Sequence, residues 1–487
     1  MQLCEKNLNQ LPDHVQRPTY DRSKVACAIV HLGIGAFHRA HQAMYTDAVL
    51  ASGDLSWGLV GAGIVSSAMK DALQPQDGLY ALAVMGPSGN QTRIIGSILD
   101  VLGDEKDDQQ LLDIMRAPST RIVSLTVTEK GYYLDPATGK LQLDAAAIAA
   151  DLANPAEPKT ALGLIVEALR LRKAAGVTPF TVLSCDNLPS NGKRAKAAVI
   201  AFAQQVDASL ADWIALEVAF PCTMVDRITP ATTDADRAAI KAQIGMDDNW
   251  PVVTEDFSQW VIEDNFTMGR PDWTIGGAVF SDEIEAWENM KLRCLNGTHS
   301  TLAYLGQLTG RETVAEAMQL PLIIDLLDAL WLEIREVLVQ PKGVDAAAYV
   351  ESLKQRFCNP AIKHRTAQIA MDGSQKLPQR LLSTLRDRIA AGLPSPTLAT
   401  AIAAWMHFAV KTAHTPGAVL NDPLSAEILA QASASNDSAV IIDKLLGLDK
   451  IFGSDLKLNS GFKAELLTGF SQLAANPQVA TAPQINL

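Results

Sequence analysis

Short runs rich in apolar and β-branched residues alternate with helix-favouring stretches through the first half of the chain. The runs fall at residues 28–32, 57–60, 121–128 and 180–184, and an Ala- and Leu-rich stretch at 161–173 separates the last two. Apolar strands separated by helices are typical of a parallel sheet that is covered on both faces. The pattern therefore predicts an α/β domain with a doubly wound sheet.

The pattern changes after about residue 282. Long amphipathic stretches rich in Ala and Leu follow, such as 320–339 and 397–410, and strand-like runs become rare. Apolar residues that recur at helical spacing predict helices, and a chain of 487 residues is too long for one core. We expect an α/β domain over residues 1–285 and a mostly α-helical domain over residues 286–487.

Composition and charge exclude several classes of protein. The chain has 54 acidic and 41 basic side chains, a formal net charge of −13, whereas nucleic-acid binding needs a basic face. The six cysteines are scattered and none has CxxC spacing, which predicts neither a disulfide framework nor a metal site. Residues 1–11 have no signal-peptide pattern and no stretch approaches the ~18 apolar residues of a membrane span. We expect a cytoplasmic protein without a metal, a membrane segment or a nucleic-acid partner.

Two glycines follow the first predicted strand. Residues 29–38 (IVHLGIGAFH) lead from this strand into a stretch that can be helical. Gly33 would permit a tight turn, and Gly35 would let the backbone approach a pyrophosphate at the helix N-terminus. His38 replaces the third glycine of the usual motif, and such glycines are also found in purely structural turns. The position after the first strand favours a Rossmann-type dinucleotide site, and the candidate cofactor-binding residues are Gly33, Gly35, Ala36, Phe37 and His38.

The preferred cofactor is harder to assign. An acidic residue ~20 positions further on commonly binds the ribose hydroxyls at the end of the second strand. Asp54 has this separation but precedes the second predicted strand, and residues 61–67 (GAGIVSS) contain neither a carboxylate nor an arginine. We expect NAD, and NADP remains open.

Residues 290–306 (MKLRCLNGTHSTLAYLG) are predicted to form a helix that carries several polar side chains. At about 100° per residue, Asn296 and His299 lie one turn apart, about 140° and about 80° around the axis from Lys291. The three side chains can converge on one wide face. The residues by themselves also allow a surface lysine, a capping asparagine and a core histidine.

The same segment resembles the lysine, asparagine and histidine signature of the polyol-specific long-chain dehydrogenases, the family of mannitol 2-dehydrogenase and fructuronate reductase. The resemblance covers most of the chain, in order, and includes residues 124–132 (SLTVTEKGY), 184–188 (SCDNL), 220–227 (FPCTMVDR), 260–265 (WVIEDN) and 364–378 (HRTAQIAMDGSQKLP). It implies a Rossmann-type dinucleotide-binding domain followed by an α-helical domain that binds the substrate. It also implies an oxidoreductase that transfers a hydride to or from a CH–OH carbon.

The resemblance implies a role for each site residue. Lys291 would be the general acid and base, which requires a lowered pKa near neutral pH. Asn296 and Asn187 would donate hydrogen bonds to the reacting oxygen as negative charge develops on it. His299 would bind a substrate hydroxyl and orient the lysine. Asn187 also fits a structural residue of a turn.

Asp226 is a further cofactor-binding candidate from these segments. It ends a predicted strand and is followed by Arg227. The alternative is a structural carboxylate at the strand end that pairs with this arginine, and the residues favour that alternative.

Substrate choice should depend on residues 364–380. This stretch contains four potential cations, His364, Arg365, Lys376 and Arg380, and a uronate carboxylate is a natural partner for arginine or lysine. Gln368 occupies a position where mannitol dehydrogenases have arginine, so the stretch resembles the fructuronate reductase branch. We expect reduction of D-fructuronate to D-mannonate with NADH, with His364, Arg365 and Lys376 at the substrate. A solvated helix face would explain the same charges.

Several alternatives remain. The substrate could be mannitol or another polyol or ketose, or tagaturonate. The short-chain dehydrogenase pattern of Tyr20 and Lys24 precedes the first strand, where it cannot face a nicotinamide. A phosphogluconate-type dehydrogenase would need Lys291 and Asn296 one residue closer. A non-catalytic dinucleotide sensor would not need Lys291, Asn296 and His299 together. The sequence does not indicate the oligomeric state.

Overall fold

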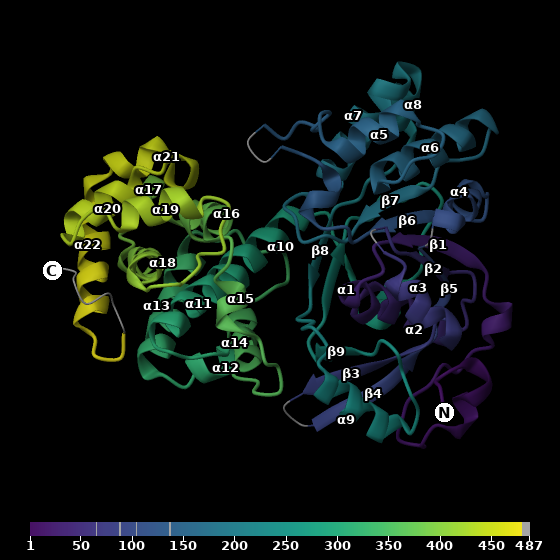
Figure 1. The fold of residues 1–487 in the computed structure, drawn as a ribbon, viewed down its shortest axis with the longest axis horizontal. Coiled ribbons are helices and arrows are strands. Elements are labelled where there is room, and N and C mark those ends of the chain that lie inside the picture. The colour runs from purple at the N-terminus through teal and green to yellow at the C-terminus, as the bar shows by residue number, and fades with distance from the viewer. Residues whose placement is uncertain (65, 87–88, 104, 136–137, 480–487) are drawn as a thin grey trace. The chain divides into compact units, whose positions relative to one another are not determined.

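The computed structural model describes residues 1–64, 66–86, 89–103, 105–135 and 138–479 (Figure 1). The chain divides into two compact units, Met1–Glu285 and Ala286–Leu487. Among the described residues, no helix is long and apolar enough to cross a membrane.

The first unit contains three sheets with helices between their strands. Its strands are β1 (Cys27–Leu32), β2 (Gly58–Ala62), β3 (Tyr80–Gly86), β4 (Gly89–Ile95), β5 (Ile98–Leu102), β6 (Ile122–Leu125), β7 (Thr181–Ser184), β8 (Thr223–Asp226), β9 (Val252–Glu255), β10 (Gln259–Ile262) and β11 (Val279–Phe280). Its helices are α1 (Ala36–Ala40), α2 (Gln42–Ala51), α3 (Ala68–Leu73), α4 (Asp108–Arg116), α5 (Ala146–Ala153), α6 (Ala161–Ala174), α7 (Asn191–Val206), α8 (Ala208–Glu217) and α9 (Asp234–Ile244).

The central sheet is parallel and has the strand order β5-β2-β1-β6-β7. The chain leaves β1 towards β2 and β5 on one side and later returns to add β6 and β7 on the other. The direction of winding therefore reverses between β1 and β6, and ligands of such sheets bind at the carboxyl ends of the strands at this point. The predicted Rossmann-type sheet is confirmed.

Other elements cover both faces of the central sheet (Figure 1), and their side chains form an apolar core on each face. On one face Val30, Val60 and Val123 pack with residues of α4, α6, α7 and α8. On the other face Ile29 and Leu59 pack with residues of α2, β3 and β10. Strands that bury both faces carry few polar residues, which explains why the apolar runs at β1, β2 and β7 were predictable.

The second unit is helical. Its segments are α10 (Ile284–Met290), η7 (Lys291–Gly297), α11 (Thr298–Leu308), α12 (Val314–Ala317), α13 (Pro321–Val337), α14 (Ala346–Phe357), α15 (Thr366–Ile369), α16 (Gly373–Leu377), η8 (Pro378–Leu382), α17 (Ser383–Ala390), α18 (Pro396–His414), α19 (Ser425–Ala432), α20 (Ser438–Leu446), α21 (Asp449–Leu458) and α22 (Ser460–Ala475). The described part of residues 286–487 contains no strand. The predicted α/β and helical architecture is confirmed.

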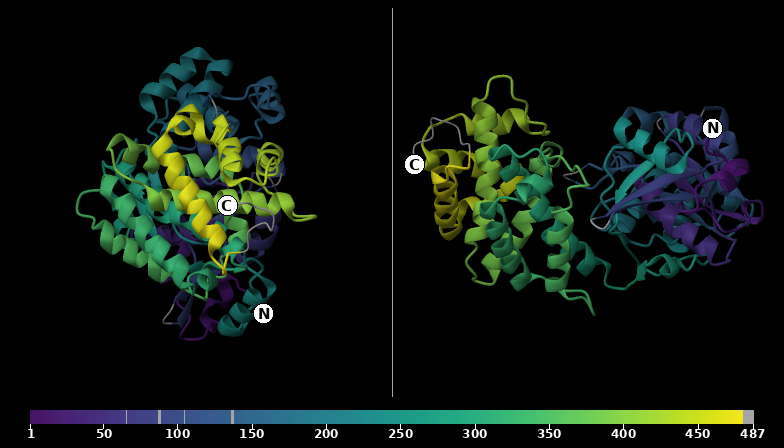
Figure 2. Two further views of the ribbon diagram at one scale, coloured as in Figure 1. Left: turned by 90° about the vertical axis from the view of Figure 1, so that its left-hand side faces the viewer. Right: turned by 90° about the horizontal axis from the view of Figure 1, so that it is seen from below.

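Helix α18 is the centre of this unit. Most of its 19 residues are buried, and α11, α13, α19 and α22 pack against it (Figure 2). A helix that is apolar on nearly all sides must be surrounded by other elements. The segment predicted as an amphipathic helix at 397–410 is therefore buried on most sides and forms the core of the unit.

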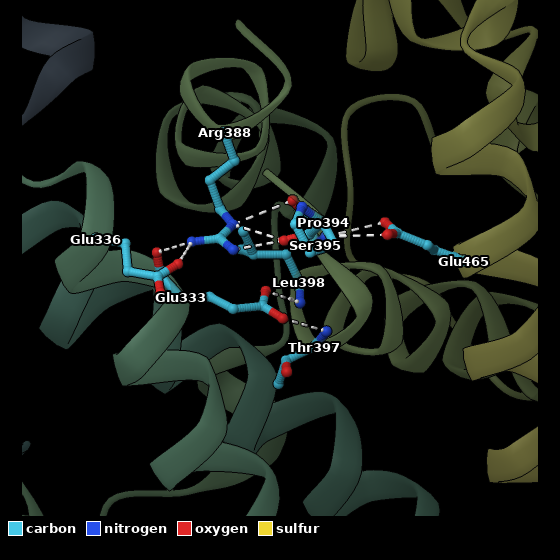
Figure 3. Close-up of polar contacts among 8 residues, drawn as sticks. All are labelled: Glu333, Glu336, Arg388, Pro394, Ser395, Thr397, Leu398 and Glu465. Atoms are coloured by element: carbon cyan, nitrogen blue, oxygen red, sulfur yellow. Dashed lines mark hydrogen bonds and ion pairs between the residues drawn. The ribbon is translucent and has the colours of Figure 1, made fainter. Parts of the chain in front are cut away.

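The N-terminus of α18 is held by carboxylates from two other helices (Figure 3). Glu333 of α13 accepts hydrogen bonds from the backbone N–H groups of Thr397 (2.7 Å) and Leu398 (2.9 Å). Glu465 of α22 accepts from the N–H of Ser395 through both carboxylate oxygens, each at 3.1 Å. The first N–H groups of a helix lack partners within the helix and favour negative charge. The two carboxylates satisfy both requirements.

Arg388 of α17 completes this cluster. Its guanidinium donates to the carbonyl oxygen of Glu333 (2.6 Å), to a carboxylate oxygen of Glu336 (2.6 Å) and to the carbonyl oxygen of Pro394 (2.5 and 3.1 Å). Its Nε also donates to Ser395 Oγ at 3.2 Å. All three nitrogens therefore have partners, and Arg388 joins α13, α17 and the start of α18.

Candidate active site

The turn after β1 has the geometry of a phosphate-binding turn. Gly33 has a φ of +98°, and a Cβ there would lie far inside van der Waals contact with the carbonyl oxygen of Thr126. Gly35 is the residue before α1, and a Cβ there would meet nothing closer than the Gly33 carbonyl oxygen, at 3.9 Å. Gly33 is therefore required by the fold, whereas Gly35 leaves open the space in front of the helix. That space is where a pyrophosphate would approach the backbone, so these residues fit a dinucleotide.

His38, which stands in place of the third glycine, is buried beneath this turn. Its ring stacks on His31 of β1 with a centroid separation of 3.4 Å. His31 in turn lies 2.8 Å from Ser124 Oγ and 2.8 Å from Thr126 Oγ1. Burial lowers the pKa of His31 to about 3, so the stacked rings are neutral. The His38 side chain supports the turn from inside, and only its backbone is available for a ligand.

The other two candidates at the turn are only partly buried. Ala36 and Phe37 form the first positions of α1, and the Phe37 ring stacks on His41 at 4.9 Å. Gly35 itself is exposed. The backbone of this first turn is the part that the structure presents to the open space.

Asp54 is excluded as the ribose-binding carboxylate. It lies before the amino end of β2, while the Gly33 turn lies at the carboxyl end of β1. Its carboxylate accepts from Ser56 Oγ (2.5 Å) and Trp57 Nε1 (3.0 Å). It therefore closes a local turn at the wrong edge of the sheet. Residue 65, within the stretch that follows β2, lies outside the described residues.

The loops after β6 and β7 are joined by Asp186. Its carboxylate accepts hydrogen bonds from the N–H of Thr128 (2.8 Å), the N–H of Val127 (3.2 Å) and the hydroxyl of Tyr132 (2.7 Å). Thr128 has a φ of +64°, a conformation that a threonine adopts only when its surroundings impose it. The strand predicted at 121–128 therefore ends at Leu125, because the next residues turn towards Asp186. Burial raises the pKa of the Asp186 carboxyl group.

Asn187 follows Asp186 and is exposed. Its position depends on Asn191, a residue that sequence reasoning missed. The buried Asn191 amide donates to the carbonyl oxygens of Ser184 (3.1 Å) and Thr223 (3.0 Å), and its Oδ1 accepts from the Thr223 N–H (2.9 Å). Asn191 thus holds the end of β7 against β8. Its signal in the sequence was only its place after a proline turn.

Asp226 is the last residue of β8 and is buried. The neighbouring Arg227 directs its guanidinium to the carbonyl oxygens of Ala40 (2.6 Å) and Glu255 (3.0 Å). The arginine therefore links β8 to the helix that follows the Gly33 turn.

The segment with Lys291 is helical, but not an ordinary α-helix. Residues Lys291–Gly297 form a π-helical segment between α10 and α11. Its hydrogen bonds join residues five apart, and such segments are frequent at functional sites. Lys291 and Asn296 are five apart, so they lie on consecutive turns of one face. The offset of about 140° expected for an α-helix does not apply here.

Lys291, Asn296 and His299 are all nearly buried, with 6%, 5% and 7% of their surfaces exposed. The Asn296 side-chain NH₂ and the His299 Nε2 have no hydrogen-bond partner among the described residues. Buried polar atoms normally have partners, and exceptions in native proteins need an explanation. A bound substrate would supply the missing partners.

Cations surround His299. Burial lowers its pKa well below the usual value, and His364, Arg380, Arg356 and Lys376 lower it further. The His364 ring lies 4.8 Å from the His299 ring, edge to face. Arg356, from α14, was not anticipated, because its only signal was a charge near the end of an amphipathic helix. The structure thus brings charges from α14, α16 and η8 to one imidazole.

The cations of residues 364–380 have different surroundings. Burial, then the charge of Arg380, lowers the pKa of Lys376 to about 8, and its Nζ donates to the carbonyl oxygens of Ile369 (3.1 Å) and Met371 (2.6 Å). Burial lowers the pKa of His364 to about 4. Arg365, in contrast, is exposed.

A metal would need a cluster of suitable ligands. Within the described part of the chain, no group of three or more His, Cys, Asp or Glu side chains could hold one.

Family models match nearly the whole chain. The mannitol dehydrogenase Rossmann domain matches residues 27–275, and the mannitol dehydrogenase C-terminal domain matches residues 283–474. The chain belongs to the mannitol dehydrogenase family of oxidoreductases. This confirms the predicted family, enzyme class and fold.

Individual relatives agree with this assignment. The chain is 45% identical to the D-mannonate oxidoreductase of Escherichia coli K12, over 94% of this chain and 96% of that one. It is 40% identical to the mannitol 2-dehydrogenase of Cereibacter sphaeroides, over 93% and 94%. The structure of Pseudomonas fluorescens mannitol 2-dehydrogenase in a ternary complex with NAD and D-mannitol is 39% identical and covers 98% of both chains, with a TM-score of 0.86.

Proposed function

We propose that this protein reduces D-fructuronate to D-mannonate with NADH, and catalyses the reverse oxidation. One observation supports a sugar acid above all: three cationic side chains, Arg380, Arg356 and Lys376, lie close enough to His299 to lower its pKa. An anionic substrate would balance this charge, whereas a neutral polyol would not. The similarity to a D-mannonate oxidoreductase supports the same choice.

Lys291 is the proposed general acid in reduction. Bound NADH supplies the hydride, which is added to the carbonyl carbon. Lys291 donates a proton to the carbonyl oxygen as negative charge develops there, and accepts it back in oxidation. The Lys291 side chain is nearly buried, with 6% of its surface exposed.

Asn296 and Asn187 are the proposed hydrogen-bond donors to the same oxygen. The Asn296 NH₂ group is buried and has no partner among the described residues, so it does not have to give up an internal hydrogen bond to meet the substrate. Donors that are already oriented stabilise a developing oxyanion effectively. His299, whose Nε2 also lacks a described partner, binds a substrate hydroxyl and orients Lys291.

NAD is the proposed cofactor. It would bind at the turn of Gly33 and Gly35, with the pyrophosphate at the start of α1 and contacts from the backbone of Ala36, Phe37 and His38. Asp226 is a further candidate for a cofactor contact. The solved relative that contains NAD supports this choice, and NADP is the alternative.

His364, Arg365 and Lys376 are the proposed residues that favour a sugar acid. Two of them act on His299. Arg365 is exposed and would contribute a longer-range attraction.

Mannitol or another polyol or ketose is the second candidate substrate, because mannitol 2-dehydrogenases are also similar to this chain. The test is a substrate panel. Fructuronate, tagaturonate and fructose are offered with NADH and with NADPH, and mannonate and mannitol with NAD and with NADP. The expected result is the highest kcat/KM for fructuronate with NADH. Activity on fructose and mannitol far above that on both uronates would overturn the proposed substrate.

A further inference from the structure

Arg380 lies near His299 and has donor groups that none of its recorded hydrogen bonds uses. Its Nη1 donates to the Asn296 carbonyl oxygen (3.3 Å) and to Ser300 Oγ (3.1 Å). Its Nε is buried and has no partner among the described residues, although the side chain as a whole remains partly exposed. The guanidinium is thus anchored at one corner. The edge formed by Nε and Nη2, which can bind a carboxylate with two parallel hydrogen bonds, makes none of its recorded hydrogen bonds.

The backbone of Arg380 is equally close to the catalytic segment. A Cβ on Gly297 would lie 2.8 Å from the Arg380 carbonyl oxygen, so only glycine lets η8 approach η7 so closely. Both segments are π-helical. Arg380 is therefore held against the turn that carries Asn296 and precedes His299, by its backbone and by its side chain.

The positive charge of Arg380 acts on the neighbouring Lys376. Arg380 disfavours the charged form of Lys376, which Asp372 and Asp422 support more weakly. Asp422 is itself engaged by the N–H (2.8 Å) and Oγ (2.5 Å) of Ser374. Two neighbouring cations that repel each other are stabilised by an anion that binds between them.

We propose that Arg380 binds the carboxylate of a sugar-acid substrate through its Nε–Nη2 edge and so determines the preference for uronates over neutral ketoses. The inference rests on the proposed function. Because Nη1 is bonded to the Asn296 carbonyl oxygen, the arginine places the carboxylate at a defined position relative to the oxygen that Asn296 and Lys291 serve.

The test compares charged and neutral substrates in the full-length enzyme. Arg380→Gln removes the charge and the fork, and Arg380→Lys keeps a charge without the fork. Both variants should lower kcat/KM for fructuronate about 100-fold and about tenfold respectively, the range of charged hydrogen bonds. The loss for fructose, which has no carboxylate, should be much smaller, so the ratio of kcat/KM for fructuronate to that for fructose should fall in both variants. If Arg380 only held Asn296 in place, the variants would lower kcat/KM equally for both substrates. That result would overturn the inference.

A binding measurement makes the test independent of turnover. The dissociation constant of D-mannonate for the NAD complex should rise at least about tenfold in Arg380→Lys, while that of NAD stays unchanged. A mannonate constant within twofold of the wild type would reject the carboxylate contact. Lys450→Gln is the matched control, because Lys450 lies on the surface of the same unit and pairs there with Glu427. Failure of the proposed function looks different: the wild type itself would neither reduce fructuronate nor bind mannonate.

Discussion

Two arginines of the helical unit, Arg380 and Arg388, lie eight residues apart and have opposite surroundings. Arg388 uses all three nitrogens, and every partner is an oxygen of the protein (Figure 3). Arg380 uses only Nη1 in its recorded hydrogen bonds and leaves a buried Nε without a described partner. The Glu336 carboxylate that pairs with Arg388 has no counterpart among the recorded partners of Arg380.

The difference distinguishes residues that stabilise the fold from residues that bind a ligand. A buried cation whose donors are all satisfied has reached its final state when the chain folds, and removing it destabilises the fold. A buried cation with an unused donor edge is incomplete, and a ligand can complete it. The same contrast applies to Gly33, which the fold requires, and Gly35, which it does not. We expect substitutions at the satisfied sites to reduce stability and those at the incomplete sites to reduce activity.

The largest effect on activity is expected from Lys291→Ala. Loss of the general acid should lower turnover by about two to four orders of magnitude. The dissociation constant of NADH, measured by fluorescence titration, should not change. Turnover close to that of the wild type would contradict the role of Lys291 as acid and base.

Arg388→Met should mainly reduce stability. It leaves the buried carbonyl oxygen of Glu333 and the carbonyl oxygen of Pro394 without their donor, which should lower the free energy of unfolding by about 3 kcal/mol. Denaturant unfolding measures this, with Lys450→Gln as a surface control that should leave the midpoint unchanged. The kcat of Arg388→Met at low temperature should remain near that of the wild type. A variant with unchanged stability and a lowered kcat would contradict the structural role of Arg388.

Gly35→Val should weaken cofactor binding. A φ of −80° suits any residue, and the added side chain would enter open space, so thermal stability should be kept. The side chain would keep a pyrophosphate from the backbone, and the dissociation constant of NADH should rise about tenfold or more. Gly33→Ala is the matched variant, and it should lose stability because its Cβ has no room. Unchanged NADH affinity in Gly35→Val would argue against the phosphate turn.

The smallest effect is a dependence on pH. The pKa of Lys376 is lowered to about 8, first by burial and then by Arg380, against Asp372 and Asp422. Lys376 is charged below this pH and neutral above it, so attraction of a carboxylate is lost as pH rises through 8. The ratio of kcat/KM for fructuronate to that for fructose should be flat below about pH 7 and fall by up to about tenfold by pH 9.

Reduction of fructose consumes the same proton as reduction of fructuronate. The ratio of the two kcat/KM values therefore removes this common pH dependence and leaves the effect of the substrate's charge. The neighbouring His364 has a pKa of about 4 and does not change its charge in this range. Lys376→Gln should give a lower ratio without the fall above pH 8. The same fall in Lys376→Gln as in the wild type would assign the pH dependence to another group.

Local patterns predicted the main elements but not all of them. Strands β1, β2 and β7 are short apolar runs, and α6, α13 and α18 are long helical stretches, so each carries its signal in its own residues. Strand β4 was missed because its first half is exposed and contains Asn90 and Gln91. It is a strand because it pairs with β3, and that pairing is a long-range contact that no local pattern encodes.

The sequence by itself determined the α/β and helical architecture, the glycine turn and the family, because apolar periodicity, backbone freedom and the signature segments are properties of contiguous residues. Only the tertiary structure decided that Lys291–Gly297 is π-helical, that His38 packs inside the turn, and that Arg356 and Arg380 act on His299 while Arg388 binds carbonyl oxygens of the protein. The sequence around Arg380 and Arg388 does not show that the two arginines have different roles. Their function depends on which oxygens surround them after folding, and those oxygens come from helices far away along the chain.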